Sequence, residues 1–131
     1  TGVHRFVAGN LLMGYGWLLV TALLLWQDLT GGGYDASLHS FFIGFVLAMV
    51  MAHAPIIFPG VFRLVLQPYH PLLWIWTALL HGSLVIRLLG DYAVIDNGQR
   101  WGSAINGMAI VGYLITIALR LLVMYHRKAR Q

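Results

Sequence analysis

An uncharged apolar run from Leu38 to Phe58 constrains the fold more than any other part of the chain. It is about as long as the ~20 residues that an α-helix needs to cross the hydrocarbon core of a bilayer. Three further apolar runs, at about 6–26, 72–89 and 103–124, each hold at most one charged side chain. The pattern predicts an all-α membrane protein, with residues 1–131 forming a single transmembrane domain. The expected fold is a four-helix transmembrane bundle with up-down-up-down order.

The composition indicates a surface that faces lipid. Hydrophobic residues make up 60% of the chain and charged residues only 9%, and there is no glutamate. A soluble domain of 131 residues needs more charge than this to cover its surface. The net charge of +4 comes from basic residues in loops and tails, so nucleic acid is not an expected partner. The expected partners are the lipid bilayer and other subunits of a membrane complex. The absence of cysteine excludes disulfides and thiolate metal sites.

The basic residues also predict an orientation. Those outside the spans fall on one side of the expected topology, with one exception. They are Arg5, Arg63, Arg127, Lys128 and Arg130, whereas Arg100 lies on the other side. The positive-inside rule then places both termini in the cytoplasm and all four aspartates outside. The expected location is the bacterial cytoplasmic (inner) membrane, in which the chain is multi-pass.

Two features of the second span predict how it packs. Gly44, Ala48 and Ala52 recur every four residues and form a strip of small side chains that allows another helix to approach closely. Pro55 is expected to kink the same helix, because it has no N–H to donate to the carbonyl one turn earlier.

Four histidines lie in or beside the predicted spans, and an ionisable group within a span is a functional-site hypothesis by default. His39 and His53 are separated by fourteen positions, which places them on nearly the same stripe of an α-helix, about 21 Å apart along its axis. His81 lies in the third span, and His70 precedes it by eleven residues on nearly the same stripe. These positions make His39, His53 and His81 the candidate metal ligands, with His70 as a further cofactor-binding candidate.

Two arrangements of these histidines remain open. In the first, His53 and His81 meet near the middle of the bundle as one site. In the second, the four histidines form two layers: His39 lies with His81, and His53 with His70. The second layout is that of two stacked b-type haems held between helices. The expected cofactors are haem b and copper, with a chlorophyll-type pigment as the lesser alternative.

The same residues also have structural interpretations. A buried neutral histidine can hydrogen-bond a neighbouring carbonyl or hydroxyl group. The candidate partners are Thr77, Ser83 and Asn106. His70, followed by Pro71, is typical of the start of a helix. Arg87 lies four residues before Asp91, which favours a salt bridge at the helix end, and the alternative is that Arg87 binds a haem propionate or another anion. Because no carboxylate lies within a span, proton-pump and secondary-transporter chemistry is disfavoured.

Three segments carry a resemblance to a known family. Residues 38–59 read LHSFFIGFVLAMVMAHAPIIFP, residues 79–91 read LLHGSLVIRLLGD, and residues 101–110 read WGSAINGMAI. The first resembles the histidine-starting helix of NnrS-type membrane proteins, and the other two are similar to the helices that follow it. More loosely, His39 with Gly44 five residues later, followed by a methionine, is similar to helix 2 of haem–copper oxidase subunit I, whose histidine is a haem ligand.

NnrS proteins contain haem and copper and are tied to nitric oxide stress. The resemblance therefore implies that His39 is the first candidate ligand, followed by His53 and His81. NnrS proteins have many more helices than this chain, and their basic segment after the histidine helix is replaced here by residues 54–60.

Two function hypotheses follow. In the first, the chain binds a haem, another tetrapyrrole or a metal through its intramembrane histidines, for electron transfer or for handling nitric oxide or haem. In the second, it is a small structural accessory subunit of a respiratory or photosynthetic membrane complex with no redox cofactor of its own. An enzyme in its own right is the outcome that the residues support least.

Overall fold

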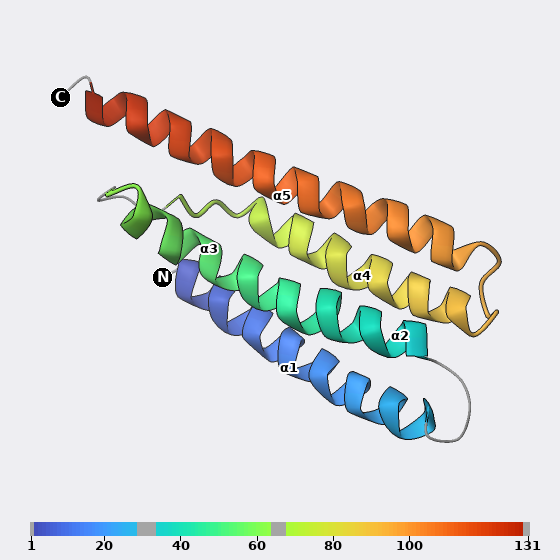
Figure 1. The fold of residues 1–131 in the computed structure, drawn as a ribbon. Helices are drawn as coiled ribbons and strands as arrows, with labels where there is room; N and C mark the ends of the chain where they lie inside the picture. Colours follow the sequence, from blue (N-terminus) through green and yellow to red (C-terminus); the bar gives the residue numbers. More distant parts are fainter. Residues whose placement is uncertain (1, 29–33, 64–67, 130–131) are drawn as a thin grey trace.

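The computed structural model describes residues 2–28, 34–63 and 68–129, and nearly all of these residues are helical. The chain runs through α1 (Gly2–Asp28), α2 (Tyr34–His39), the π-helix η1 (Ser40–Leu47), α3 (Ala48–Val61), α4 (Leu73–Asp91) and α5 (Gly98–Ala129) (Figure 1). The segments α2, η1 and α3 follow one another without a break and form one long helix.

The predicted four spans are confirmed as four helices that are long and apolar enough to cross a membrane. Each span extends a few residues past its predicted bounds at both ends, except that the third begins at Leu73, one residue after its predicted start. The largest difference is at the end of α5, because the basic segment predicted as a tail continues the helix as far as Ala129. A basic end agrees with the helix dipole, which favours cations at a C-terminus.

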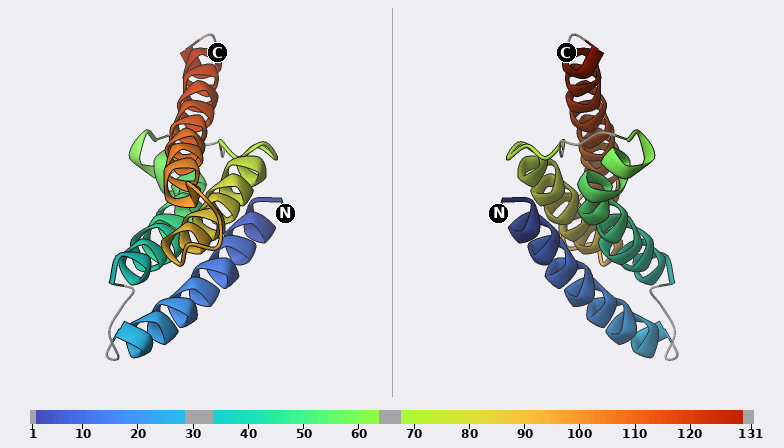
Figure 2. Two further views of the ribbon diagram at one scale, coloured as in Figure 1. Left: turned by 90° about the vertical axis from the view of Figure 1, so that its right-hand side faces the viewer. Right: turned by 90° about the vertical axis from the view of Figure 1, so that its left-hand side faces the viewer.

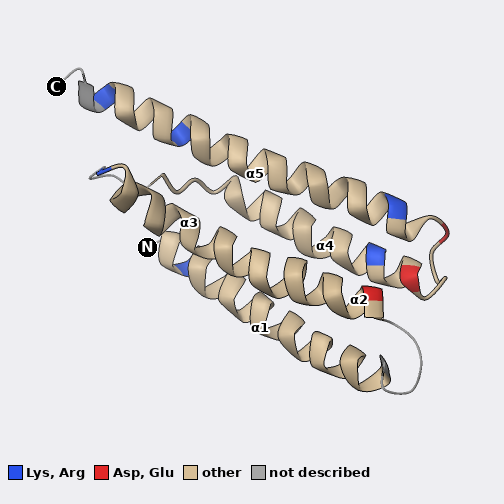
Figure 3. Cartoon of the chain, in the orientation of Figure 1, with Lys and Arg blue, Asp and Glu red and all other residues tan. Residues whose placement is uncertain are grey.

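The four spans alternate in direction, so both ends of the chain lie at the same end of the bundle (Figure 1). Figure 3 shows that every acidic residue described in the structure lies at the opposite end, whereas the end that carries the termini holds basic residues. Arg5 lies near the start of α1, Arg63 follows the end of α3, and Arg120 and Arg127 lie in the C-terminal part of α5. Asp35 lies in the first turn of α2, Arg87 and Asp91 lie at the end of α4, Asp96 lies between α4 and α5, and Arg100 lies at the start of α5. Figure 2 shows that α5 diverges from the other helices toward its C-terminus.

The small-residue strip is buried, as predicted, and it accommodates α1. Ala48 and Ala52 are fully buried, and Gly44 lies directly against Trp17 of α1. A Cβ placed at Gly44 would lie 2.5 Å from Cγ of the Trp17 indole, which leaves no room for a side chain. The close approach of α1 to η1 therefore depends on glycine at this position.

Pro55 lies inside α3, and the helix continues past it to Val61. Proline cannot donate to the carbonyl of Met51, four residues earlier. That carbonyl instead accepts a hydrogen bond of 2.5 Å from the hydroxyl of Tyr113, a buried residue of α5. The predicted loss of an intrahelical bond is thus compensated by a bond between two helices.

The π-helix η1 is a feature that the sequence analysis did not predict. The hydroxyl of its first residue, Ser40, lies 2.8 Å from the Thr21 hydroxyl of α1 and 2.9 Å from the Ser37 carbonyl, and it donates its one proton to only one of them. A π-helix turns by less per residue than the ~100° of an α-helix. Because η1 lies between His39 and His53, the prediction that these two share nearly one stripe of a regular helix is wrong.

Candidate functional site

His39 and His53 hold the same kind of backbone hydrogen bond. The Nδ1 atom of His39 lies 2.8 Å from the carbonyl oxygen of Asp35, and the Nδ1 atom of His53 lies 2.8 Å from that of Met49. A carbonyl oxygen only accepts, so in both rings Nδ1 carries the proton when the imidazole is neutral. The Nε2 atom of each ring then has a lone pair available to an electrophile or a metal.

His70 and His81 have the opposite arrangement. The Nδ1 atom of His81 accepts from the indole N–H of Trp17 at 2.9 Å, and the Nδ1 atom of His70 accepts from the backbone N–H of Leu72 at 3.2 Å. An indole or amide N–H only donates, so in the neutral rings the proton is on Nε2. The Nε2 atom of His70 and His81 is therefore a hydrogen-bond donor, whereas the Nε2 atom of His39 and His53 is an acceptor.

The structure thus divides the four candidate histidines into two chemical pairs. The described parts of the chain contain no group of three or more His, Cys, Asp or Glu side chains that could hold one metal ion. Both predicted arrangements pair His81 with another histidine. In the structure its ring instead lies beside the Trp17 ring and nearly parallel to it, at an interplanar angle of 15°. His70 lies just before α4, where its ring accepts the N–H of Leu72 and so agrees with the helix-start interpretation.

Arg87 joins three helices at the acidic end of the bundle. It donates to the Asp35 carboxylate at 2.9 Å, and also to the hydroxyl of Ser103 and the carbonyl of Gln99 in α5. Asp35 lies within 3.4 Å of the His39 ring, so its carboxylate brings together two of the predicted site residues, His39 and Arg87.

The predicted salt bridge between Arg87 and Asp91 is wrong. Both carboxylate oxygens of Asp91 are buried, and no residue in the described part of the chain hydrogen-bonds them. Arg87 pairs instead with Asp35, which lies 52 positions away in sequence. Asp35 lies in the first turn of α2, where the helix dipole stabilises a negative charge.

A groove of about 660 Å³ lies between α1 and α4, beside the pair formed by Trp17 and His81. Apolar side chains such as Leu12 and Val85 form its walls, and Gly16 and Gly82 widen it. A Cβ added at either glycine would meet nothing within 4 Å. His81 is only 6% exposed, and its Nε2 atom is buried with no hydrogen-bond partner among the described residues.

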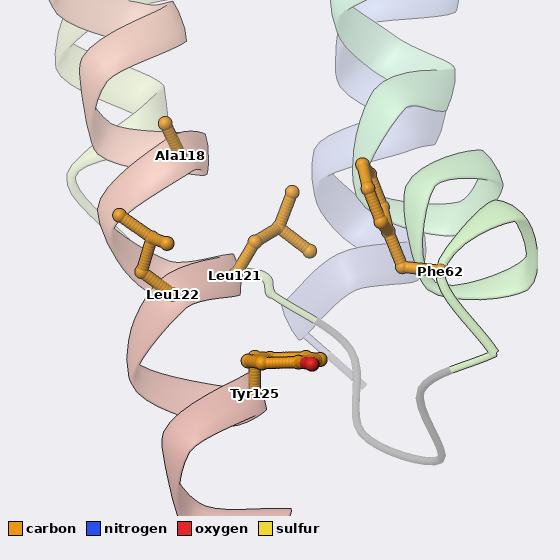
Figure 4. A pocket seen from close by; sticks show the side chains of 5 residues that line it. All are labelled: Phe62, Ala118, Leu121, Leu122 and Tyr125. Carbon is orange, nitrogen blue, oxygen red and sulfur yellow. The ribbon is translucent and has the colours of Figure 1, made fainter.

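A second cleft, of about 390 Å³, separates the ends of α3 and α5 where α5 diverges. Figure 4 shows that the ring of Phe62 lies across from Leu121 and Tyr125 of α5. Its lining is apolar except for the Tyr125 hydroxyl, and it includes none of the four histidines. Such a lining suits packing against lipid or an apolar helix rather than holding a polar cofactor.

Trp17 is a partner of His81 that was not predicted from the sequence. The predicted histidine partners have other roles: Thr77 and Ser83 donate to carbonyls of α4, and Asn106 has no hydrogen-bond partner within the described residues. A signal was available, because a tryptophan placed in the middle of a span must find an acceptor for its N–H.

Four helices that are long and apolar enough to cross a membrane, with histidines among their residues, are typical of the class of multi-pass helical membrane proteins. Within that class, the chain belongs to the family described as Domain of unknown function (DUF8744), which matches residues 1–122. No curated protein and no solved structure matches the chain.

Proposed function

We propose that this chain is a haem b-binding subunit of a larger complex in the bacterial cytoplasmic membrane, with both termini in the cytoplasm. His53 and His39 are each the ligand of a separate haem, because fourteen positions of one continuous helix separate them. The role is electron transfer or the handling of nitric oxide or haem. The orientation is supported by the basic residues at the end of the bundle that carries the termini. The resemblance of residues 38–59 to the histidine helix of NnrS-type proteins supports the choice of cofactor.

The observation that carries the proposal is the hydrogen bond at Nδ1 of His39 and His53. Histidines that bind metals in proteins donate the other ring N–H to a carbonyl or carboxylate, which fixes the tautomer and orients the ring. Both histidines have such a bond at 2.8 Å, and at His39 the Asp35 carboxylate lies within 3.4 Å as well. The donor set therefore fits an iron porphyrin that takes a neutral imidazole.

His81 and His70 serve other roles in this proposal. To bind a metal through Nε2, either ring would have to move its proton to Nδ1. In that state Nδ1–H would face the N–H of Trp17 or of Leu72, and two donors would oppose each other. Haem, when bound through an imidazole, supplies one-electron chemistry whose potential depends on the axial ligand and on its burial.

The test is an absorption spectrum of the detergent-purified protein, oxidised and dithionite-reduced, with and without added haemin. The variants are His53→Ala, His39→Ala and His81→Ala, and His126→Ala is the matched control because this histidine is exposed near the end of α5. We expect a sharp reduced-state band that is lost or weakened in His53→Ala and His39→Ala and retained in His81→Ala and His126→Ala.

Three results would contradict the proposal. A colourless preparation that does not take up haemin would exclude haem binding. A band that survives the loss of both His39 and His53 would place the haem elsewhere, and a band lost only in His81→Ala would show that the tautomer argument is wrong. Metal analysis of the same preparation distinguishes bound copper from haem iron.

The second candidate function is that of a structural accessory subunit without a redox cofactor. The cleft between α3 and α5 favours it, because a helix of another subunit can fill an apolar opening between two spans. In that case the preparation is colourless, and all four histidine variants behave like the wild-type protein.

A further inference from the structure

We propose that the groove between α1 and α4 binds a lipid-soluble quinone, with a ring carbonyl of the quinone accepting a hydrogen bond from Nε2–H of His81. This site is separate from the haem site, because its central histidine has the opposite tautomer. It does not depend on whether His39 and His53 bind haem.

The first step of the argument is the direction of the hydrogen bond at His81. Trp17 can only donate, so the bond of 2.9 Å to Nδ1 leaves the proton of the neutral ring on Nε2. The exposed fraction of His81 is only 6%, and its Nε2–H has no acceptor among the described residues. A buried donor without an acceptor costs about 1–3 kcal/mol. Protein atoms cover Nε2 in this structure, so a ligand in the groove gains this hydrogen bond by shifting the side chains that cover it.

The second step is depth. His81 is the ninth residue of α4, which spans Leu73–Asp91, so it lies roughly 12 Å from one end of the helix and 15 Å from the other. In a hydrocarbon core about 30 Å thick, this is close to the middle. The ester carbonyls of phospholipids lie at the edges of the core, so they do not reach His81. A quinone ring is uncharged and soluble in the core, and it brings its acceptor oxygens to this depth.

The third step is the shape and lining of the groove. A volume of about 660 Å³ falls within the ~300–1,000 Å³ typical of small-molecule sites. The polar groups that line it are the His81 ring and the indole N–H of Trp17, which donates its hydrogen bond to His81. The other side chains of the lining are apolar. An anion or a sugar would be poorly solvated there, whereas a flat ring with an isoprenoid tail suits it. Gly16 and Gly82 supply the open space on the two facing helices.

The test measures binding of decylubiquinone to the full chain in nanodiscs, by quenching of tryptophan fluorescence. Gly82→Leu fills the groove and leaves the Trp17–His81 bond in place, and His81→Phe removes the donor. Gly107→Leu is the matched control, because Gly107 lies on α5, outside the groove, and a Cβ there also meets nothing within 4 Å.

We expect saturable quenching by the wild-type protein and by Gly107→Leu. Gly82→Leu should weaken binding at least tenfold, and His81→Phe should weaken it about fivefold, as expected for the loss of one hydrogen bond. Haemin binding should be unchanged in Gly82→Leu, which separates this site from the haem site.

Quenching that rises linearly with quinone concentration, and equally in Gly82→Leu and Gly107→Leu, would overturn the proposal, because it reports partition into lipid. Saturable binding that Gly82→Leu does not weaken would place the quinone elsewhere. Phospholipid that stays with the purified wild-type protein and is lost in Gly82→Leu, without quinone binding, would identify the groove as a lipid site instead. If His81→Phe does not fold, as judged by circular dichroism, Gly82→Leu decides alone.

Discussion

Replacing Tyr113 with phenylalanine tests how the bundle compensates for Pro55. The substitution removes the hydroxyl that donates to the Met51 carbonyl at 2.5 Å and leaves that carbonyl unsatisfied in the core. A lost hydrogen bond of this kind costs about 1–3 kcal/mol in soluble proteins when the partner stays buried. Measured values between membrane helices average about 0.6 and reach about 1.7 kcal/mol. We therefore expect Tyr113→Phe to lower the free energy of unfolding by about 1–1.5 kcal/mol.

The second variant, Pro55→Ala, makes the test specific. Alanine restores the N–H that a regular helix donates to the Met51 carbonyl, so the hydroxyl of Tyr113 is no longer required there. In the Pro55→Ala background, Tyr113→Phe should cost no more than about 0.5 kcal/mol. The free energies come from equilibrium unfolding in mixed detergent micelles, followed by circular dichroism.

The control for Tyr113→Phe is Tyr125→Phe, which removes a hydroxyl from an exposed tyrosine of the same helix. It should change the free energy of unfolding by less than about 0.3 kcal/mol, because water or lipid headgroups replace the contact. The reasoning is refuted if Tyr113→Phe costs as much in the Pro55→Ala background as in the wild-type protein, or if it costs no more than Tyr125→Phe.

Further predictions concern helix packing and the charged cluster. Gly44→Leu should separate α1 from η1 and lower the free energy of unfolding by at least about 2 kcal/mol. Gly107→Leu is the control, because a Cβ there meets nothing within 4 Å, and it should change the free energy of unfolding by less than about 0.5 kcal/mol. The same unfolding assay measures both variants. Arg87→Gln should cost about 1 kcal/mol, since its carboxylate partner Asp35 is 60% exposed and solvent screens the pair. Asp91→Asn should be neutral or stabilising, because it removes a charge for which the described residues provide no partner. A loss of more than about 1 kcal/mol in Asp91→Asn would show that Asp91 has a partner after all.

Features that depend on one helix alone could be predicted from the sequence. The length of the apolar runs gave the four spans, and the four-residue repeat of Gly44, Ala48 and Ala52 gave a buried face. The missing N–H of Pro55 likewise identified which carbonyl would need another donor. Each of these follows from helix geometry and from the chemistry of a single residue.

Pairings between helices could not be predicted in the same way. The partner of Arg87 lies 52 positions away, that of His81 lies 64 positions away, and that of the Met51 carbonyl lies 62 positions away. Which side chains meet depends on the rotation of each helix about its axis, and several rotations satisfy the same hydrophobic pattern. The sequence therefore identified the polar groups that need partners better than it identified the partners.

The π-helix η1 gives the two ends of one continuous span separate directions. In a regular α-helix, the choice of a face for His53 would also settle the face of His39, and both imidazoles would address the same neighbour. With the wider turns of η1 between them, His39 can adjoin Asp35 and the arginine of α4 while His53 takes its own direction. A single-residue deletion within η1 that restores an α-helix would rotate one end against the other. Two ligands on this helix consequently belong to two surroundings, and each can be altered without changing the other.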